Sequence, residues 1–181
     1  IARAAAYVPA RTVITASALP MNACIQVEAV VSHGDGTPPQ AVEDRHGLIV
    51  EANNTDKAPK CPLSTQTVAF SHYNHLSAQL PLDPHTGAVV TGGVKEQTKQ
   101  CLTNIKAIVE SIGHVMDDVV KVNIFLKNIS DINAMDEVYK EFFPGGIPAR
   151  RIVGVADLPE QACIQIDAVV SNAEGTPPTT K

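Results

Sequence analysis

Residues 148–170 read PARRIVGVADLPEQACIQIDAVV, and residues 9–31 read PARTVITASALPMNACIQVEAVV. When the gapless alignment is extended to 8–39 and 147–178, more than half of the paired positions are identical. Each copy begins with Pro-Ala-Arg and β-branched residues, passes a Leu-Pro turn, and ends in an alternating and then apolar run, which is typical of strand, turn and strand. The repeat therefore predicts the same two-stranded unit twice in the chain.

The residues between the two copies supply the other elements of a domain. Apolar residues at a period of two predict strands, and those at helical spacing predict helices, the first of which Gly113 ends. The predicted elements are strands at 68–70 and 76–80 around a turn at 71–74, a helix at about 93–112, a strand at 117–126, and a helix at about 131–143 capped by Ser130-Asp131. With the two strands of the second copy, the order ββαβαββ predicts an α+β two-layer sandwich with both helices on one face.

The first copy lacks the elements that would complete a domain around it. We expect residues 1–39 to form the C-terminal strands of an incomplete repeat, residues 40–57 to form a polar linker, and residues 58–181 to form a complete domain. Two strands without helices cannot bury their own apolar face, so the half-copy must pair with the second domain, with another chain, or with a missing N-terminal fragment. We favour a longer tandem precursor whose fragments stay associated; strand donation within a trimer is the alternative.

Charge and apolar patterning narrow the class of partner. The formal net charge is −5 and no run of Lys or Arg occurs, so nucleic acid is not expected as the main partner. No apolar run is long enough for a spanning helix, which argues against a membrane location. The uncovered face of the predicted sheet, rich in Ile, Val and Ala, instead indicates an oligomer interface.

Cysteine and histidine spacing gives no metal site. The cysteines, which lack the close pairing of metal ligands, predict reduced and mostly buried thiols in the cytoplasm, with an organelle as the alternative. They are Cys24, Cys61, Cys101 and Cys163. His72 and His75 would point to opposite sides of a strand, so we expect no shared metal there.

Four sets of motifs follow one another along the second part of the chain. They are Gln79-Leu80-Pro81 with Thr86-Gly87, the run QTKQCLTNIKAIVE at 97–110, Val120-Lys121-Val122 with Phe125-Leu126-Lys127, and Pro148-Ala149-Arg150 with Leu158-Pro159. Together they resemble the reactive-intermediate deaminase family, also called Rid, YjgF or L-PSP. The resemblance covers a complete domain at about 58–171, and residues 8–32 resemble the C-terminal tail of a second copy.

This resemblance implies a chorismate-mutase-like fold and a homotrimer whose sheets form a central β-barrel, with clefts between subunits. It also implies hydrolysis of reactive 2-imino or enamino acids to 2-oxo acids and ammonia without a cofactor. Arg150 would clamp the carboxylate of the small substrate through a bidentate pair. Ser77 and Ala78 would line the cleft, and Asp136 stands where the family often has Asn.

Two departures from the family pattern affect the expected chemistry. Gln165 stands where the deaminases commonly have a Glu that activates water, and an amide cannot accept a proton at neutral pH. Ile152 stands where a Cys is common. The first copy shares the amide, so Arg11 and Gln26 are candidates for a second cleft. A non-catalytic module that binds or senses small carboxylates is therefore the alternative to a deaminase, and an endoribonuclease is the third class.

Overall fold

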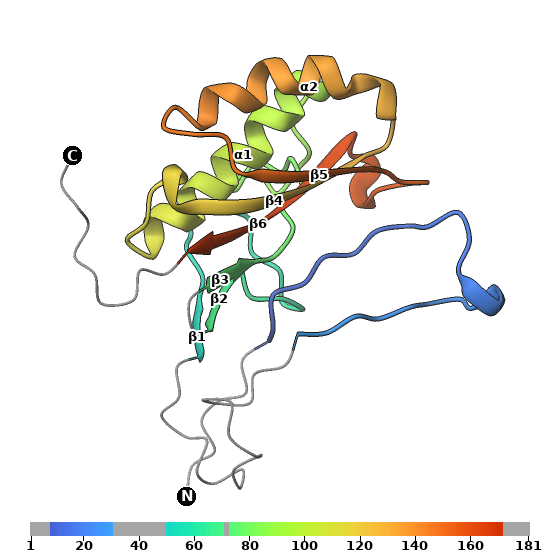
Figure 1. Ribbon diagram of the computed structural model, residues 1–181, viewed down its shortest axis with the longest axis horizontal. Coiled ribbons are helices and arrows are strands. Elements are labelled where there is room, and N and C mark those ends of the chain that lie inside the picture. Colours follow the sequence, from blue (N-terminus) through green and yellow to red (C-terminus); the bar gives the residue numbers. More distant parts are fainter. Residues whose placement is uncertain (1–7, 31–49, 71–72, 172–181) are drawn as a thin grey trace, which may run out of the picture.

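The computed structural model describes residues 8–30, 50–70 and 73–171 (Figure 1). Its six-stranded sheet has the order β1-β2-β3-β6-β4-β5, in which only β4 and β5 are parallel neighbours. The strands are β1 Val50–Asn53, β2 Thr67–Phe70, β3 Tyr73–Leu76, β4 Val119–Leu126, β5 Ala149–Gly154 and β6 Ile164–Ser171. Helices α1 (Val94–Ser111) and α2 (Ile132–Tyr139) pack on one face of the sheet, which confirms the α+β two-layer architecture.

Strand β6, from the second copy of the repeat, lies inside the sheet between β3 and β4. Its Ile164 and Ile166 belong to the same buried cluster as Leu102 and Ile105 of α1. Burial of each such side chain stabilises the fold by about 1.5–3 kcal/mol. The second strand of the repeated segment therefore lies at the centre of the domain.

Helix α1 matches its predicted range and ends where Gly113 predicts. Gly113 adopts a φ of +80°, and its N–H donates to the carbonyl of Glu110 (3.2 Å). The N–H of His114 donates to the carbonyl of Val109 (3.1 Å). These two bonds are those of a Schellman C-cap, which requires a left-handed residue at this position.

Helix α2 is shorter than predicted and is not capped as predicted. Its last turn tightens into a 3-10 turn at Lys140–Phe142. The side chain of Asp131 makes no capping hydrogen bond, because a 3-10 turn at Ile129–Asp131 precedes the helix and Asn128 Oδ1 accepts the N–H of Ser130 (3.3 Å). The cap therefore lies one turn earlier than Ser130-Asp131.

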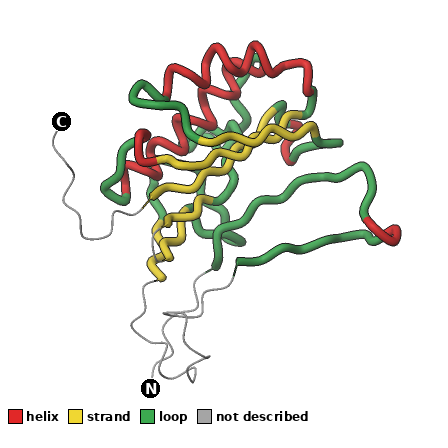
Figure 2. Tube along the Cα trace, viewed as in Figure 1, coloured by secondary structure: helices red, strands yellow, loops and turns green. Residues whose placement is uncertain are grey.

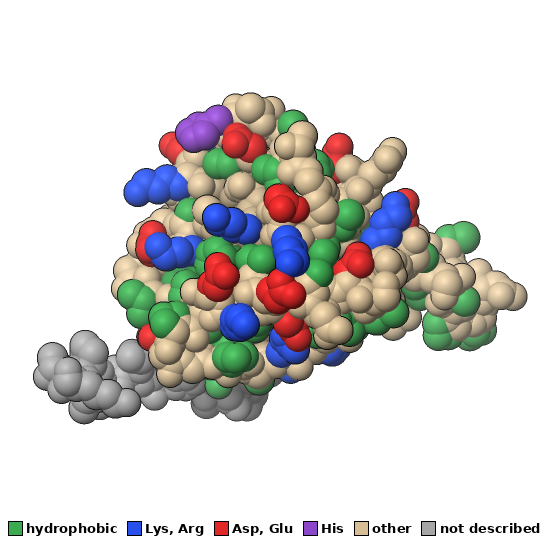
Figure 3. Space-filling model, turned by 90° about the horizontal axis from the view of Figure 1, so that it is seen from above, with side chains coloured by type: hydrophobic (Ala, Val, Ile, Leu, Met, Phe, Trp, Pro, Cys, Tyr) green, Lys and Arg blue, Asp and Glu red, His purple; other side chains and the backbone are tan. Residues whose placement is uncertain are grey.

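The outer surface over the helices carries side chains of both charges. Figure 3 shows Lys and Arg interspersed with Asp and Glu on this face. Two exposed pairs illustrate the mixing, Lys95 with Glu137 and Lys106 with Glu110. In the ranges that the structure describes, no helix combines the length and apolar character needed to cross a bilayer.

The first strands differ from the prediction in extent. In the hairpin, Phe70 is the register partner of Tyr73, so β3 starts earlier than predicted, and the turn residues 71–72 lie outside the described ranges. The expected strand at 76–80 is instead extended chain that bridges β6 at Gln79 and Ile166. Strand β1 pairs with β2 within the segment expected to be a linker, so the order becomes βββαβαββ.

The first copy of the repeat forms an arm, residues 8–30, with two legs joined by a 3-10 turn at Pro20–Asn22 (Figure 2). The second copy has the same turn at Pro159–Gln161. The second residue of each turn is left-handed, with a φ of 57° at Met21 and 56° at Glu160. The turn of the repeat is therefore confirmed in both copies.

The strands of the repeat form only in the second copy. The first leg of the arm has one isolated bridge, between Thr15 and Asp157, and the second leg, residues 23–30, has no strand pairing within the described residues. Ile25 and Val27 are therefore 75% and 78% exposed, whereas the equivalent Ile164 and Ile166 are buried. The predicted strands are thus not formed in residues 8–30, because in the described ranges no counterparts of β3 and β4 lie beside them.

Candidate functional site

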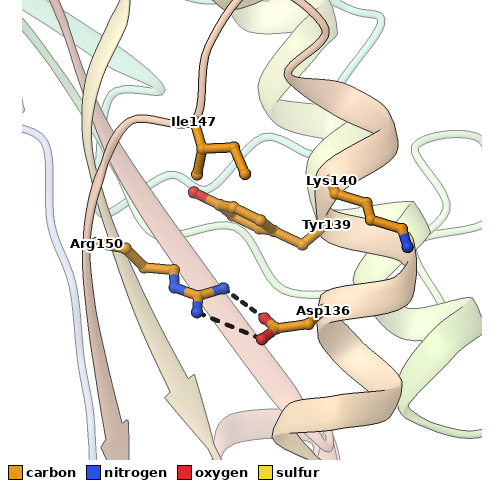
Figure 4. A pocket seen from close by; sticks show the side chains of 5 residues that line it. All are labelled: Asp136, Tyr139, Lys140, Ile147 and Arg150. Carbon is orange, nitrogen blue, oxygen red and sulfur yellow. Dashed lines mark hydrogen bonds and ion pairs between the residues drawn. The ribbon is translucent and has the colours of Figure 1, made fainter.

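Arg150 opens onto a pocket between β5 and α2. The pocket has a volume of about 300 Å³ and is lined by Asp136, Tyr139, Lys140, Ile147 and Arg150 (Figure 4). Two guanidinium nitrogens of Arg150 donate to the two carboxylate oxygens of Asp136, the longer bond being 3.4 Å. The guanidinium carbon lies 5.1 Å from the ring centroid of Tyr139, within cation–π range. The structure thus brings two predicted site residues, Arg150 and Asp136, together.

Tyr139 forms the wall beneath the guanidinium. Burial raises its pKa to about 12, so the phenol is neutral at physiological pH. Its hydroxyl oxygen is buried, and no hydrogen-bond partner for it lies within the described residues. Tyr139 is therefore a hydrogen-bond donor and a packing surface for Arg150, and it cannot serve as a base.

The charges around the pocket favour a small anion. Arg150 and Lys140 contribute two positive charges and Asp136 one negative charge. The side chains of Arg150 and Asp136 remain 28% and 38% exposed, so an incoming carboxylate can reach the guanidinium. Arg150 has further N–H donors beyond those directed at Asp136. Asp136 competes with such a ligand, which the Asn common at this position in the family would not do.

Ser77 and Ala78 contact Arg11 rather than Arg150. The hydroxyl of Ser77 accepts the main-chain N–H of Arg11 (2.8 Å) and donates to the carbonyl of Thr65 (2.5 Å). The N–H of Ala78 donates to the carbonyl of Arg11 (3.1 Å). The residues predicted to line the cleft thus lie beside the Arg of the first copy.

Gln165 lies on the opposite face of the sheet from Arg150. Side chains alternate along a strand, and Ile164 and Ile166 on either side of it belong to the core under the helices. The side chain is buried, and Oε1 has no hydrogen-bond partner within the described part of the chain. Gln165 and Arg150 of one chain therefore do not share a cleft.

The remaining predicted residues lie away from the pocket lining. Ile152 packs against the main core. Gln26 is exposed on the second leg of the arm, whereas Arg11 lies on the first leg against the domain. The proposed second cleft of Arg11 and Gln26 is therefore not formed as a pair on one surface.

Tyr139 and Lys140 were not predicted as pocket residues. Both lie on the helical turn that follows Asp136, at the spacings that place side chains on one helix face, and this signal was available in the sequence. A second missed contact joins the arm to the sheet, where Thr12 Oγ1 donates to Asp167 Oδ2 (2.8 Å). Asn123 Nδ2 donates to the other oxygen of Asp167 (2.6 Å). No sequence pattern indicated this contact.

The cysteines are only partly as predicted. All four are free thiols, but Cys24 and Cys61 are exposed while Cys101 is buried. The N–H of Leu63, which donates to the sulfur, is the main cause of a lowered pKa of Cys61. Within the described residues no cluster of three or more potential metal ligands occurs, and His72 lies outside those residues.

The family model that matches this chain and its most similar relatives point to the same family. The family model described as Endoribonuclease L-PSP matches residues 55–172. A 2-iminobutanoate/2-iminopropanoate deaminase of Dermatophagoides farinae is 43% identical over 59% of this chain and 83% of its own length. The human protein of the same name is 39% identical over 67% of this chain and 90% of its own length. A RutC family protein of Pyrococcus abyssi is 43% identical over 64% of this chain and 91% of its own length.

Solved structures agree with these sequence relationships. RidA from the Antarctic bacterium Psychrobacter sp. has a TM-score of 0.64 and 35% identity, covering 67% of this chain and 98% of its own. E. coli TdcF with bound serine has a TM-score of 0.65 and 30% identity, covering 68% of this chain and 99% of its own. The arm and β1 precede the segment that the family model matches. The chain belongs to the endoribonuclease L-PSP family, the family of RidA and YjgF.

Proposed function

We propose that this protein is a hydrolytic deaminase that converts reactive 2-imino acids and their enamine tautomers to 2-oxo acids and ammonia. The observation that carries the proposal is its identity of about 40% to proteins named 2-iminobutanoate/2-iminopropanoate deaminase, over most of their length. Substrates of this class carry a carboxylate next to the C=N carbon. The site must therefore hold a small anion in a fixed orientation.

In this proposal Arg150 binds the substrate carboxylate. The pocket around it carries a net positive charge and is open to solvent. A guanidinium and a carboxylate form paired, charge-assisted hydrogen bonds, which fix both position and direction. The related TdcF has been crystallised with serine, which carries a carboxylate of the same kind.

The reaction needs water and proton transfers but no redox step. Water attacks C2 of the protonated imine, and the resulting carbinolamine loses ammonia to leave the carbonyl of the 2-oxo acid. In the pocket, Tyr139 is a neutral phenol and the carboxylate of Asp136 is held by Arg150. We therefore expect the rate gain to come mainly from fixing the substrate, an effect that can be large when the reacting groups are well placed.

The test is hydrolysis of 2-iminobutanoate generated in solution by an amino-acid oxidase. We expect the protein to exceed the spontaneous rate and Arg150→Ala to lose about 10- to 100-fold of this gain, as expected for a charge-assisted hydrogen-bonded contact. Arg151→Ala is the matched control, since it removes the same charge from the neighbouring residue on the other face of β5. Equal losses in both variants would contradict a specific role for Arg150.

A non-catalytic carboxylate-binding module is the second candidate, and Gln165 favours it. An amide can hold a water molecule but cannot act as a general base. Gln165 and Arg150 of one chain lie on opposite faces of the sheet, so this candidate applies to a water held on the face of Gln165; there Gln165→Glu should raise imine turnover by about 100-fold or more, because general-base help is typically that large. If the natural protein binds 2-oxobutanoate but does not exceed the spontaneous rate of imine hydrolysis, the binding-module proposal replaces the deaminase proposal.

The endoribonuclease class has less support, since the net charge is −5 and charges of both signs share the helix face (Figure 3).

A further inference from the structure

The hydroxyl of Tyr139 is a buried donor that no other described residue uses. Tyr139 is 1% exposed, and within the described residues no group accepts a hydrogen bond from its hydroxyl. Its pKa of about 12 keeps the proton on the phenol at physiological pH. Because a buried hydroxyl without a partner destabilises a fold, contacts within the described chain give no reason for Tyr rather than Phe here.

Two neighbouring groups fix the position of the Tyr139 ring. The ring centroid of Phe143 lies 4.8 Å from that of Tyr139. The guanidinium carbon of Arg150 lies 5.1 Å from the same centroid, and Asp136 holds that guanidinium by an ion pair. The hydroxyl and the guanidinium are therefore held in a fixed arrangement relative to each other.

The hydroxyl and the guanidinium also belong to one pocket. Tyr139 and Arg150 line the same volume of about 300 Å³ (Figure 4). This volume is at the lower end of the range for ligand sites and suits a molecule with few heavy atoms. A small molecule bound to the guanidinium can therefore also reach the hydroxyl.

Ile147 controls access to the hydroxyl. Figure 4 shows the hydroxyl end of Tyr139 pointing toward Ile147, which lines the same pocket. Ile147 is 64% exposed, so its side chain can change rotamer within nanoseconds. An entering ligand can thus displace this side chain and contact the hydroxyl oxygen, which is otherwise shielded from solvent.

The hydroxyl needs an acceptor, and this narrows the class of ligand. A carboxylate held by Arg150 brings the substituent on its C2 carbon into the same small pocket. An oxo oxygen on C2 accepts a hydrogen bond, whereas a methylene group cannot and an ammonium group has no free lone pair. The net positive charge of the pocket lining further disfavours an ammonium group.

We propose that Tyr139 is a specificity-determining residue of the Arg150 pocket, and that its hydroxyl donates a hydrogen bond to the oxygen on C2 of a bound 2-oxo acid. Arg150 binds the carboxylate, and Tyr139 distinguishes 2-oxo acids from carboxylic acids without an oxygen on C2. The inference rests on the carboxylate-binding role of Arg150 in the proposed function.

The same hydrogen bond bears on the proposed reaction. The nitrogen of a protonated imine has no lone pair with which to accept a hydrogen bond. The oxygen that water adds to C2 forms the carbinolamine, and it remains on C2 as the oxo oxygen after ammonia leaves. Tyr139 therefore stabilises the carbinolamine more than the imine, and an interaction that strengthens along the reaction lowers its barrier.

The test compares two ligands and two proteins by isothermal titration calorimetry on the full chain. We expect the natural protein to bind 2-oxobutanoate about 3- to 10-fold more tightly than butanoate, which is the gain typical of one hydrogen bond. Tyr139→Phe should reduce this ratio to about one. Urea unfolding should give Tyr139→Phe a stability equal to or above that of the natural protein, because no described group accepts from the hydroxyl.

Two control variants separate the hydroxyl from the carboxylate clamp. Tyr73→Phe removes a hydroxyl from β3, which β6 and β4 separate from β5, and it should keep the natural preference for 2-oxobutanoate. Arg150→Ala should weaken the binding of both ligands. If Arg150→Ala binds butanoate like the natural protein, the clamp fails and this inference fails with it.

A second measurement does not require a folded variant at position 139. The chain has three tyrosines, Tyr7, Tyr73 and Tyr139, and Phe variants of the first two assign the third in a spectrum of tyrosine labelled with ¹³C at Cζ. In the natural chain, 2-oxobutanoate should shift the Tyr139 signal more than butanoate does, because only the 2-oxo acid accepts from the hydroxyl. Equal shifts would contradict the inference.

An unchanged ligand preference in Tyr139→Phe would overturn the inference while leaving the clamp intact. A loss of stability in this variant without a change in preference would assign the hydroxyl to an internal water molecule instead. No readout involves imine hydrolysis. A protein that selects 2-oxobutanoate through Tyr139 but does not exceed the spontaneous rate of hydrolysis would therefore refute the deaminase proposal alone.

Discussion

Arg150 and Asp136 form an ion pair in which both side chains are partly exposed. Pairs of this kind contribute about 1 kcal/mol or less, because solvent screens them. The Pro-Ala-Arg motif pointed to Arg150 from the sequence alone. The contact between Arg150 and Tyr139 could not be predicted from the sequence, because it joins a strand to a helix and depends on the tertiary fold.

Removing the Asp136 charge should strengthen carboxylate binding. We expect Asp136→Asn to tighten the affinity for 2-oxobutanoate by up to about fivefold, since a ligand then no longer competes with an ion pair worth about 1 kcal/mol. Isothermal titration calorimetry measures this directly. Glu137→Gln is the matched control, because it removes the same charge from the next residue, which pairs with Lys95. Weaker binding by Asp136→Asn would show that Asp136 orients Arg150 rather than competing with the ligand.

Asp167 should make stability depend on pH in the opposite sense to most paired carboxylates. Burial raises its pKa above the ordinary 3.8, against the opposing effects of Asn123, Thr12, Arg151 and His75. The folded state therefore holds the proton more tightly than the unfolded state. The resulting stabilisation is present below the unfolded pKa and is lost as the pH rises through the folded pKa.

The free energy of unfolding of Asp167→Asn, measured relative to that of the natural protein, should therefore be higher at about pH 7 than at about pH 3. Urea unfolding at the two pH values measures the difference. For Asp157→Asn we expect the opposite pH dependence. Lys127 lowers the pKa of Asp157, so the stabilisation from this carboxylate is lost as the pH falls. A constant difference between Asp167→Asn and the natural protein would contradict the assignment.

At the scale of elements, the end of α1 depends on backbone conformation alone. A Cβ added at Gly113 would meet no atom within 4 Å, although its φ is +80°. We expect Gly113→Ala to lower the free energy of unfolding by about 1 kcal/mol, the cost of a left-handed L-residue. Urea unfolding checks this value.

Gly146→Ala is the control for that substitution. Gly146 also has no atom within 4 Å of an added Cβ, and its φ lies outside the left-handed region. Its replacement should leave stability nearly unchanged. A loss at Gly146 equal to that at Gly113 would contradict the assignment to the left-handed φ of Gly113, because removing a glycine from the unfolded chain by itself raises stability.

The sequence predicted helices better than strand ends. The apolar spacing of α1 and its stop at Gly113 are local properties, so the predicted range matches Val94–Ser111 closely. Strand limits depend on partners far away in the sequence. Residues near Gln79 read as a strand of the hairpin, yet Gln79 bridges Ile166 of β6. Val50–Asn53, inside the segment expected to be a linker, instead pairs with β2.

At the scale of the whole molecule, two segments that are identical at more than half of their paired positions have different structures. The strands of the second copy belong to the sheet, whereas the first copy forms an arm that contacts the domain through its first leg and projects beyond it (Figures 1 and 2). The repeat predicted strands in both copies, because sequence similarity reflects only the local preference of each segment for a strand. The difference follows from what surrounds each copy, since β4 fills the space between β5 and β6 and the arm has no such strand.

The paired turns at Pro20–Asn22 and Pro159–Gln161 have a consequence for how the chain folds. Because the first turn keeps its shape without a sheet, its conformation is fixed by neighbours in sequence. Such turns form within about 10 microseconds, ahead of contacts that close long loops. Folding of the domain can therefore start near its C-terminal end, with the turn setting β5 and β6 on either side of the place into which β4 then inserts.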